Sequence, residues 1–143
     1  MLFNKRPRLL ERLLVVEDEP LVAFDNEHGL REAGYEVVAT VDNVPEAMRV
    51  LEAEPLDLVL LDLNLHGEDS GLDVADAARL KGVPVLLVTA NPPPEADRFA
   101  LGCLRKPYSD KALRNALAAI DELLGGDAPK APAGLTLYAG VAG

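Results

Sequence analysis

Groups that can bind phosphate or a metal ion stand directly after short apolar runs at four places in this chain. They are Glu17-Asp18-Glu19, Asp62, Thr89 and Lys106. If the runs are neighbouring parallel strands, their carboxyl ends meet at one edge of a sheet, where open α/β sheets bind ligands. Clustered carboxylates repel one another, and Mg²⁺, which prefers oxygen ligands, would neutralise them. The sequence therefore predicts a magnesium site beside groups that can handle phosphate.

Asp62 is the expected centre of the chemistry, because the fully apolar run Leu58–Leu61 before it indicates a buried central strand. A carboxylate displayed at the end of such a strand can attack phosphorus and form an acyl phosphate. Mg²⁺ and the Lys106 ammonium can neutralise the transferring phosphoryl group, and Thr89 can donate a hydrogen bond to it. Taken singly, each residue has a plain structural explanation, such as a turn or a solvated strand end. The prediction depends on their convergence.

The composition limits the classes of protein that the chain can belong to. It has 143 residues, 49% hydrophobic and 27% charged, which fits one globular domain. A formal net charge of −10 argues against nucleic-acid binding. Its single cysteine, Cys103, allows no internal disulfide and fits a reducing compartment. Acids interrupt the first apolar run, so we expect neither a signal peptide nor a membrane span, and a cytoplasmic location.

Apolar periodicity predicts five strands that alternate with helices. The strands are expected at Leu13–Val16, Tyr35–Val41, Leu58–Asp62, Val83–Val88 and from Gly102 onward. Helices are expected at Leu21–Ala33, Pro45–Ala53, Leu72–Leu80 and Asp110–Leu124, with room for only one or two helical turns in Glu95–Leu101. Right-handed crossovers then give an α/β fold with a doubly wound, five-stranded parallel sheet, (βα)5 and flavodoxin-like, with a shortened fourth helix.

Local signals refine these elements. Asn43 and Ser109 are predicted N-caps of the helices that follow them. The inward face of the first helix is expected to carry Leu21, Val22, Phe24, His28 and Leu30.

The chain is expected to divide into three segments. Residues 1–11 read as a flexible arm or a short helical turn, and residues 12–124 as the folded domain. Residues 125–143 are rich in Gly, Ala and Pro and are predicted to be mostly disordered, because they have little to bury. Within this tail, Leu135–Tyr138 is the one stretch apolar enough to dock on a surface.

Four motifs occur in a fixed order: Val15-Val16-Glu17-Asp18-Glu19-Pro20, Leu60-Leu61-Asp62-Leu63-Asn64-Leu65, Val88-Thr89-Ala90 and Lys106-Pro107. Together they resemble the motifs of response-regulator receiver domains, over roughly Leu13 to Leu124. The resemblance implies that Asp62 accepts a phosphoryl group. It also implies that Asp18 and Asp62 contact Mg²⁺, that Glu17 acts on it through water, and that Asn64 offers its backbone carbonyl.

The resemblance also implies which residues respond to the phosphoryl group and which protein donates it. Thr89 would be the switch hydroxyl and Lys106 would hold a phosphoryl oxygen. The donor would be a sensor histidine kinase or a histidine phosphotransfer protein. The chain would act as a single-domain response regulator, a monomer or weak dimer, that docks on a downstream protein or drains phosphate from a kinase. Its chemistry would be self-catalysed phosphotransfer and autodephosphorylation rather than enzymatic turnover.

Three departures from the family pattern concern output. Cys103 stands where a Tyr or Phe usually acts as a rotating switch, and a small buried thiol cannot swing in that way. Thr89 and Lys106 are 106 − 89 = 17 positions apart, which is shorter than usual and leaves little room for a fourth helix. His66 stands where a proline often follows. The missing aromatic switch at Cys103 and the shortened fourth helix favour the phosphate-drain interpretation.

Two other functions compete with this one. A phosphohydrolase using an aspartyl phosphate would need a second acid two positions after Asp62, and Asn64 cannot act as acid or base. The other candidate is an interaction module with the same fold that works without phosphorylation. The complete set of acids, hydroxyl and ammonium argues against that candidate.

Overall fold

The computed structural model describes residues 7–65 and 71–138. Its sheet has the strand order β2-β1-β3-β4-β5-β6. Strands β1 to β5 pair in parallel, and β6 is antiparallel to β5. The strands are β1 (Arg12–Val16), β2 (Glu36–Val41), β3 (Leu58–Asp62), β4 (Val85–Thr89), β5 (Gly102–Arg105) and β6 (Leu135–Leu137).

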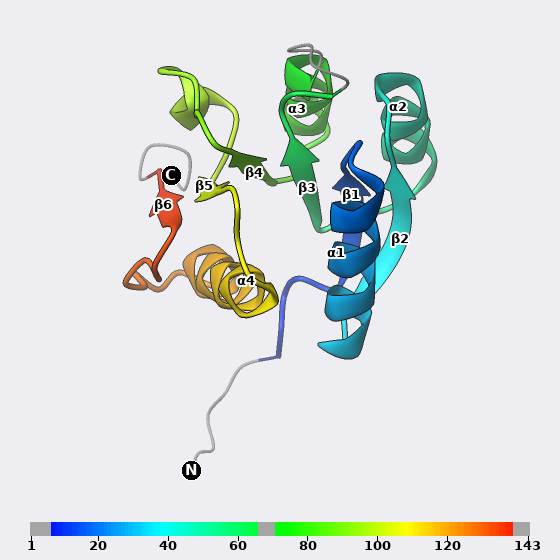
Figure 1. Ribbon diagram of the computed structural model, residues 1–143. Helices are drawn as coiled ribbons and strands as arrows, with labels where there is room; N and C mark the ends of the chain where they lie inside the picture. The colour runs from blue at the N-terminus through cyan, green and yellow to red at the C-terminus, as the bar shows by residue number, and fades with distance from the viewer. Residues whose placement is uncertain (1–6, 66–70, 139–143) are drawn as a thin grey trace.

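Helices cover both faces of this sheet. They are α1 (Pro20–Glu32), α2 (Val44–Ala53), α3 (Gly71–Leu80) and α4 (Asp110–Leu124), and a 3-10 turn, η1 (Ala96–Arg98), stands between β4 and β5. Figure 1 shows α1 and α4 on one face and α2 and α3 on the other. Each face has its own apolar core, with Leu13 and Leu60 in one and Leu14 and Leu61 in the other. The predicted α/β architecture is confirmed, and η1 takes the place of the shortened fourth helix.

The helix starts agree with the predicted caps. Asn43 Oδ1 accepts a hydrogen bond from the Glu46 backbone N–H at 2.9 Å, and Ser109 Oγ accepts one from Ala112 at 3.0 Å. These side chains satisfy N–H groups that have no partner within the helix. All residues of β3 and β4 are buried, as continuous apolar runs predict for central parallel strands.

The predicted inward face of α1 is wrong in part. Leu21 and Phe24 are 80% and 68% exposed, and His28 is exposed as well, whereas Asn26, Gly29 and Leu30 are buried. A side chain at position 29 would collide with the Asp110 carboxylate at the start of α4. The two helices approach each other at this glycine, and the buried face of α1 is the one that carries Asn26, Gly29 and Leu30.

The sheet has one strand more than the five-stranded sheet predicted from the sequence. The extra strand, β6, comes from the tail that composition marked as mostly disordered, at the stretch judged able to dock. Leu135 is 6% exposed and lies opposite Leu104 of β5. Without β6, the edge strand β5 would expose unpaired backbone groups and apolar side chains, and β6 pairs with the former and covers the latter.

Part of the predicted flexible arm is fixed to the body of the protein. The backbone N–H groups of Leu9 and Leu10 both donate to Asp121 Oδ2 at 2.8 Å, and the Leu10 side chain is buried. The Arg8 guanidinium lies 4.1 Å from the ring centroid of Tyr35. The buried Asp121 carboxylate on α4 needs hydrogen-bond donors, and the arm supplies two of them.

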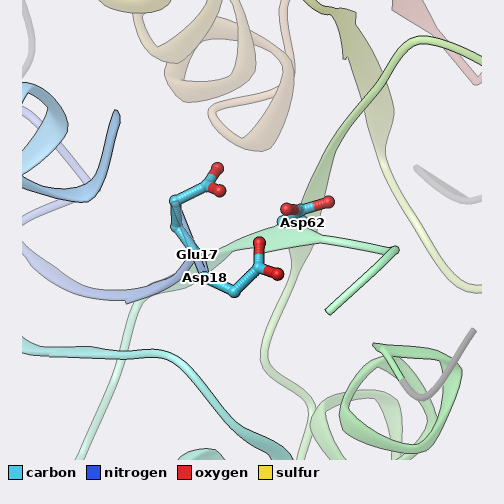
Figure 2. A group of neighbouring side chains, drawn as sticks. All are labelled: Glu17, Asp18 and Asp62. Carbon is cyan, nitrogen blue, oxygen red and sulfur yellow. The ribbon is translucent and has the colours of Figure 1, made fainter. Parts of the chain in front are cut away.

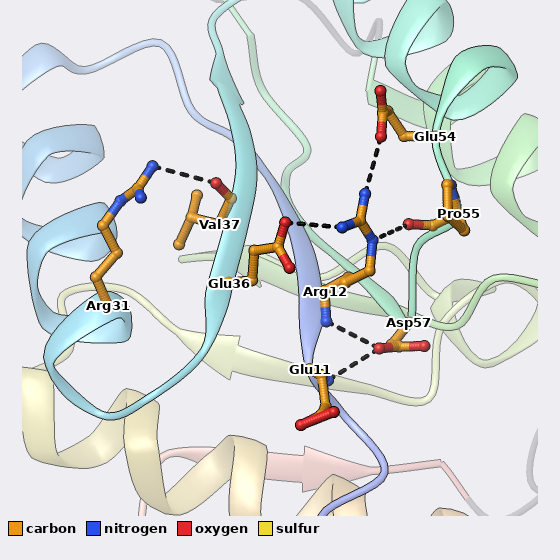
Figure 3. A network of polar contacts seen from close by, with 8 residues as sticks. All are labelled: Glu11, Arg12, Arg31, Glu36, Val37, Glu54, Pro55 and Asp57. Atoms are coloured by element: carbon orange, nitrogen blue, oxygen red, sulfur yellow. Dashed lines mark hydrogen bonds and ion pairs between the residues drawn. The ribbon is translucent and has the colours of Figure 1, made fainter.

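A polar network closes the end of the sheet opposite the predicted site. The Arg12 side chain donates to Glu36 at 2.7 Å, to Glu54 at 2.8 Å and to the Pro55 carbonyl at 2.8 Å. The Asp57 carboxylate accepts from the backbone N–H of Arg12 at 2.8 Å and of the preceding residue at 2.9 Å. Figure 3 shows these contacts joining β1, β2 and the loop before β3. They fix the amino ends of the strands, whose carboxyl ends hold the site.

Candidate functional site

Strand register brings the predicted site residues to one edge of the sheet. Val16 pairs with Leu61, so Glu17, the next residue after β1, comes beside Asp62. Asp62 in turn lies opposite Val88, the residue before Thr89. Thr89 pairs with Arg105, which precedes Lys106. Glu17, Asp62, Thr89 and Lys106 therefore arrive at the same rim.

Three carboxylates meet at this rim. Glu17, Asp18 and Asp62 each offer an oxygen, and these oxygens all lie within 4.8 Å of one another. Figure 2 shows the side chains of Glu17 and Asp18, from the end of β1, turned toward Asp62 at the end of β3. Glu17 and Asp62 are only 2% and 4% exposed, and Asp18 is half-buried.

The Lys106 ammonium joins two of these carboxylates. Its Nζ lies 3.0 Å from Glu17 Oε1 and 3.2 Å from Asp62 Oδ2. Burial alone would lower the pKa of Lys106, but the close ion pair with Glu17 and the charge of Asp62 raise it. The ammonium therefore stays charged at any physiological pH. It bridges the acid cluster from the cis Lys106–Pro107 turn.

Backbone N–H groups fix the acids and the hydroxyl. Asp62 Oδ1 accepts from the Asn64 N–H at 3.1 Å, and Glu17 Oε2 accepts from Glu19 at 3.1 Å. Thr89 Oγ1 accepts from the Asn91 N–H at 3.2 Å, an arrangement that leaves the hydroxyl hydrogen able to donate to another acceptor. The side chains are thus held at the rim before any ligand arrives.

The raised pKa of Glu17 indicates that a cation fits at the three carboxylates. Burial raises the pKa of Glu17 from 4.5 to about 7, and the Asp62 charge adds to the rise, although Glu19 and Lys106 oppose it. Oε1 of Glu17 is buried and, among the described residues, has no hydrogen-bond partner in good geometry. A buried acid cluster with incomplete compensation fits a hard divalent cation such as Mg²⁺. Asp18 and Asp62 would hold the ion, with Glu17 beside it.

We expect Glu17→Gln to stabilise the Mg²⁺-free protein at pH 8 and to have little effect at pH 4.5. Because folding raises the pKa of Glu17, the folded state keeps the proton longer than the unfolded state as the pH rises. Stability is therefore lost from about pH 4.5 until the pH passes about 7. The loss amounts to about 3 kcal/mol, and the neutral amide avoids it. Urea unfolding with a chelator present at several pH values measures the difference.

Glu52→Gln is the matched control, because Glu52 is an exposed carboxylate that pairs with Lys81 on the surface. The Glu52→Gln variant should have the same free energy of unfolding as the wild type at every pH. Added Mg²⁺ should reduce the advantage of Glu17→Gln, because the cation stabilises the ionised wild-type cluster. A Glu17→Gln variant that is less stable than wild type at pH 8 would contradict the account of Glu17.

One pair near the site was missed by sequence reasoning. The Tyr108 hydroxyl and the Asn26 side chain exchange hydrogen bonds at 3.0 and 3.2 Å. Burial raises the pKa of Tyr108 to about 12. The pair closes the α1 side of the site, next to Lys106. Neither residue follows a strand or forms a motif, so only the packing of α1 on the β5–α4 turn identifies it.

The structure shows the surroundings of Cys103, one of the departures from the family pattern, and of Asn64. Cys103 is 4% exposed, and burial raises the pKa of its thiol, so it packs as a small apolar residue. Asn64 is exposed beyond Asp62, where its backbone carbonyl stays a predicted ligand. His66 lies outside the described residues.

The comparisons with known proteins agree with this geometry. The chain matches the family model of the response regulator receiver domain over residues 13–118. It is 34% identical over 104 residues to the transcriptional regulatory protein PdtaR of Mycobacterium tuberculosis, covering 68% of this chain and 50% of that protein. It is 36% identical over 92 residues to the phyllosphere-induced regulator PhyR of Methylorubrum extorquens, covering 63% and 33%. The chain thus spans half or less of the length of these relatives.

Solved structures show the same fold. A CheY-like receiver domain protein from Methanospirillum hungatei superposes with a TM-score of 0.69 at 24% identity, over 79% of this chain and 94% of that one. The receiver domain of sensor histidine kinase PA1611 from Pseudomonas aeruginosa, described with a magnesium ion in its active-site cleft, gives 0.65 at 28% identity, over 75% and 93%. No helix in the described parts of this chain is long and apolar enough to cross a membrane. From its strand order, its converging acids and these matches, the chain belongs to the response regulator receiver domains of two-component systems.

Proposed function

We propose that this receiver domain accepts a phosphoryl group on Asp62 from a sensor histidine kinase or a histidine phosphotransfer protein. The observation that carries the proposal is the position of the Asp62 carboxylate. It is buried at the rim, held by the Asn64 N–H on one oxygen and by Lys106 on the other. Glu17 and Asp18 lie beside it.

In the proposed transfer an Asp62 oxygen forms a bond to phosphorus while the bond from phosphorus to the donor imidazole nitrogen breaks. The imidazole leaves with the electron pair of that bond. Mg²⁺, when bound by Asp18 and Asp62, would neutralise charge on the phosphoryl oxygens. Lys106 is 23% exposed at its side chain and already lies 3.2 Å from Asp62 Oδ2, so it can follow the new oxygens with a small movement. The Thr89 hydroxyl supplies the second hydrogen bond to them.

The same geometry favours a role as a phosphate acceptor rather than a hydrolase acting on free substrates. Asn64, two residues after Asp62, contributes its backbone N–H to the carboxylate and has no side chain able to activate water. Loss of the phosphoryl group then depends on water reaching the acyl phosphate. We propose that the phosphorylated protein docks on a downstream partner or drains phosphate from its kinase in the cytoplasm.

Phosphoryl uptake by the wild-type protein tests the proposal. With acetyl phosphate and Mg²⁺, we expect one phosphoryl group per chain, lost in alkali and in hydroxylamine as an acyl phosphate is. A chelator should suppress the uptake, because the acid cluster would repel the donor. Absence of label with Mg²⁺ present would contradict phosphoryl acceptance and favour the interaction module that works without phosphorylation.

A further inference from the structure

The C-terminal strand β6 is held at the open edge of the sheet by few contacts. Figure 1 shows β6 beside β5, at the end of the sheet away from β2. Besides the ladder, the Arg105 N–H donates to the Gly134 carbonyl and the Tyr138 N–H donates to the Leu101 carbonyl, both at 2.9 Å. These two bonds close the two ends of the paired segment.

Gly102 on β5 makes room for this strand. A Cβ at position 102 would lie 2.6 Å from the Thr136 carbonyl oxygen, closer than real Cβ atoms come to any atom. Its next neighbours would be the Leu135 and Leu137 side chains, both at 3.4 Å. All three neighbours belong to β6. A side chain at position 102 would therefore obstruct β6 first.

β6 also reaches the site through Cys103. Thr136 lies opposite Cys103 in the strand register, and the Tyr138 side chain packs against the core that contains Cys103. The Cys103 thiol interacts with the backbone of Thr89 on its other side. Cys103 thus pairs with β6 in the strand register and interacts with the backbone of Thr89.

A second link runs through the end of β5. Lys106 pairs with Asp62 by its side chain and donates its backbone N–H to the Thr89 carbonyl at 3.2 Å. The residue before it, Arg105, holds the Gly134 carbonyl by its own N–H. Two consecutive residues therefore carry the site ammonium and the hydrogen bond at the start of β6.

Docking of β6 is a weakly stabilised part of the fold. The strand has three residues, of which only Leu135 is buried, while Thr136 is exposed and Leu137 half-buried. It is joined to α4 by residues 125–134, which form neither helix nor strand. Short edge segments with few buried contacts open at low free-energy cost. A coupling of about 1.4 kcal/mol would change the equilibrium constant between docked and undocked β6 tenfold.

We propose that β6 is a detachable strand whose docking on β5 is opposed by a phosphoryl group on Asp62. The inference rests on the proposed function and adds its regulation. The phosphoryl oxygens draw the Lys106 ammonium and the Thr89 hydroxyl toward Asp62, which pulls the end of β5 away from the Gly134 carbonyl. The backbone of Thr89 shifts at Cys103 in the same movement. The strand then leaves, and the β5 edge becomes the surface that reports phosphorylation.

Amide hydrogen exchange on the full chain tests the release, with beryllofluoride and Mg²⁺ as the phosphoryl mimic. We expect the amides of Arg105 and Tyr138 to exchange about tenfold faster with the mimic, while amides within α1 do not. Equal or slower exchange at both positions, with the mimic bound, would overturn the release but leave the phosphoryl site intact. Failure of the wild type to bind the mimic would overturn the proposed function and the release with it.

If phosphorylation of Asp62 favours release of β6, release of β6 must in turn favour binding of the phosphoryl mimic, because coupling between two sites is reciprocal. Gly102→Val should undock β6 and increase the affinity for beryllofluoride three- to tenfold. Leu135→Ser loosens the strand by a separate route and should act in the same direction if Gly102→Val fails to fold. Leu80→Ser, at a leucine that is 76% exposed on α3, is the control and should leave the affinity unchanged. Unchanged or weaker affinity in the folded β6 variants would contradict the coupling.

Discussion

Asp62→Asn is expected to take up at least a hundredfold less phosphoryl group than the wild type from acetyl phosphate with Mg²⁺. The amide has nearly the shape of the carboxylate, but its oxygen and nitrogen are poor nucleophiles toward phosphorus. The Asn64 N–H can still donate to the amide oxygen, as it does to Asp62 Oδ1. Loss of labelling would therefore come from the chemistry and not from a changed loop. Radiolabel or intact-mass measurement of the phosphorylated fraction gives the result.

The control for this variant is Asp76→Asn, at an exposed carboxylate on α3 that pairs with Arg79 at 3.0 Å. It should label as the wild type does. Asp62→Asn should also be at least as stable as the wild type at pH 8 without Mg²⁺, because it removes one charge from three crowded carboxylates. Equal labelling of Asp62→Asn and wild type would place the phosphoryl group on another residue and contradict the assigned acceptor.

The convergence of the site could be predicted from the sequence, because parallel strands present their carboxyl ends at one rim. Asp62 and Lys106 are 44 positions apart, and β4 alone separates their strands in the sheet. Knowing that each follows a strand was enough to place them together. The bounds of β3 and α4 were predicted for the same reason, since continuous apolar runs and a helical period are local properties of the chain.

Features that depend on close approach between elements could not be predicted. Gly29, on the buried face of α1, lies against Asp110 at the start of α4, and Gly102 leaves room for the sixth strand, β6. In the sequence these two glycines are not distinguishable from glycines that end helices. The roles of both residues come from what packs against them.

The second prediction concerns the exposed apolar residues of α1 and the docking of the phosphoryl donor. Leu21 and Phe24 are exposed although both are strongly apolar, and Phe24 stacks on His28 with 6.2 Å between the ring centroids. Next to them a cavity of about 710 Å³ lies between α1 and the start of α4, and its lining includes Val22 and Lys106. We propose Leu21, Phe24 and this cavity as the contact surface for the phosphoryl donor. A donor protein seated on it would reach the rim where Lys106 and Asp62 meet.

We therefore expect Phe24→Asp to slow transfer from a phosphorylated histidine protein ten- to hundredfold at subsaturating donor, as truncation of a central interface residue does. Labelling by acetyl phosphate should not change, because that donor needs no protein surface. Leu80→Asp places the same charge at an exposed leucine of α3, which lies on the opposite face of the sheet (Figure 1), and should leave both rates as in the wild type. Stopped-time phosphotransfer assays with the two donors separate the effects. If Phe24→Asp slows both donors equally, α1 acts on the chemistry of Asp62 and not on docking; if it slows neither, the donor protein binds elsewhere.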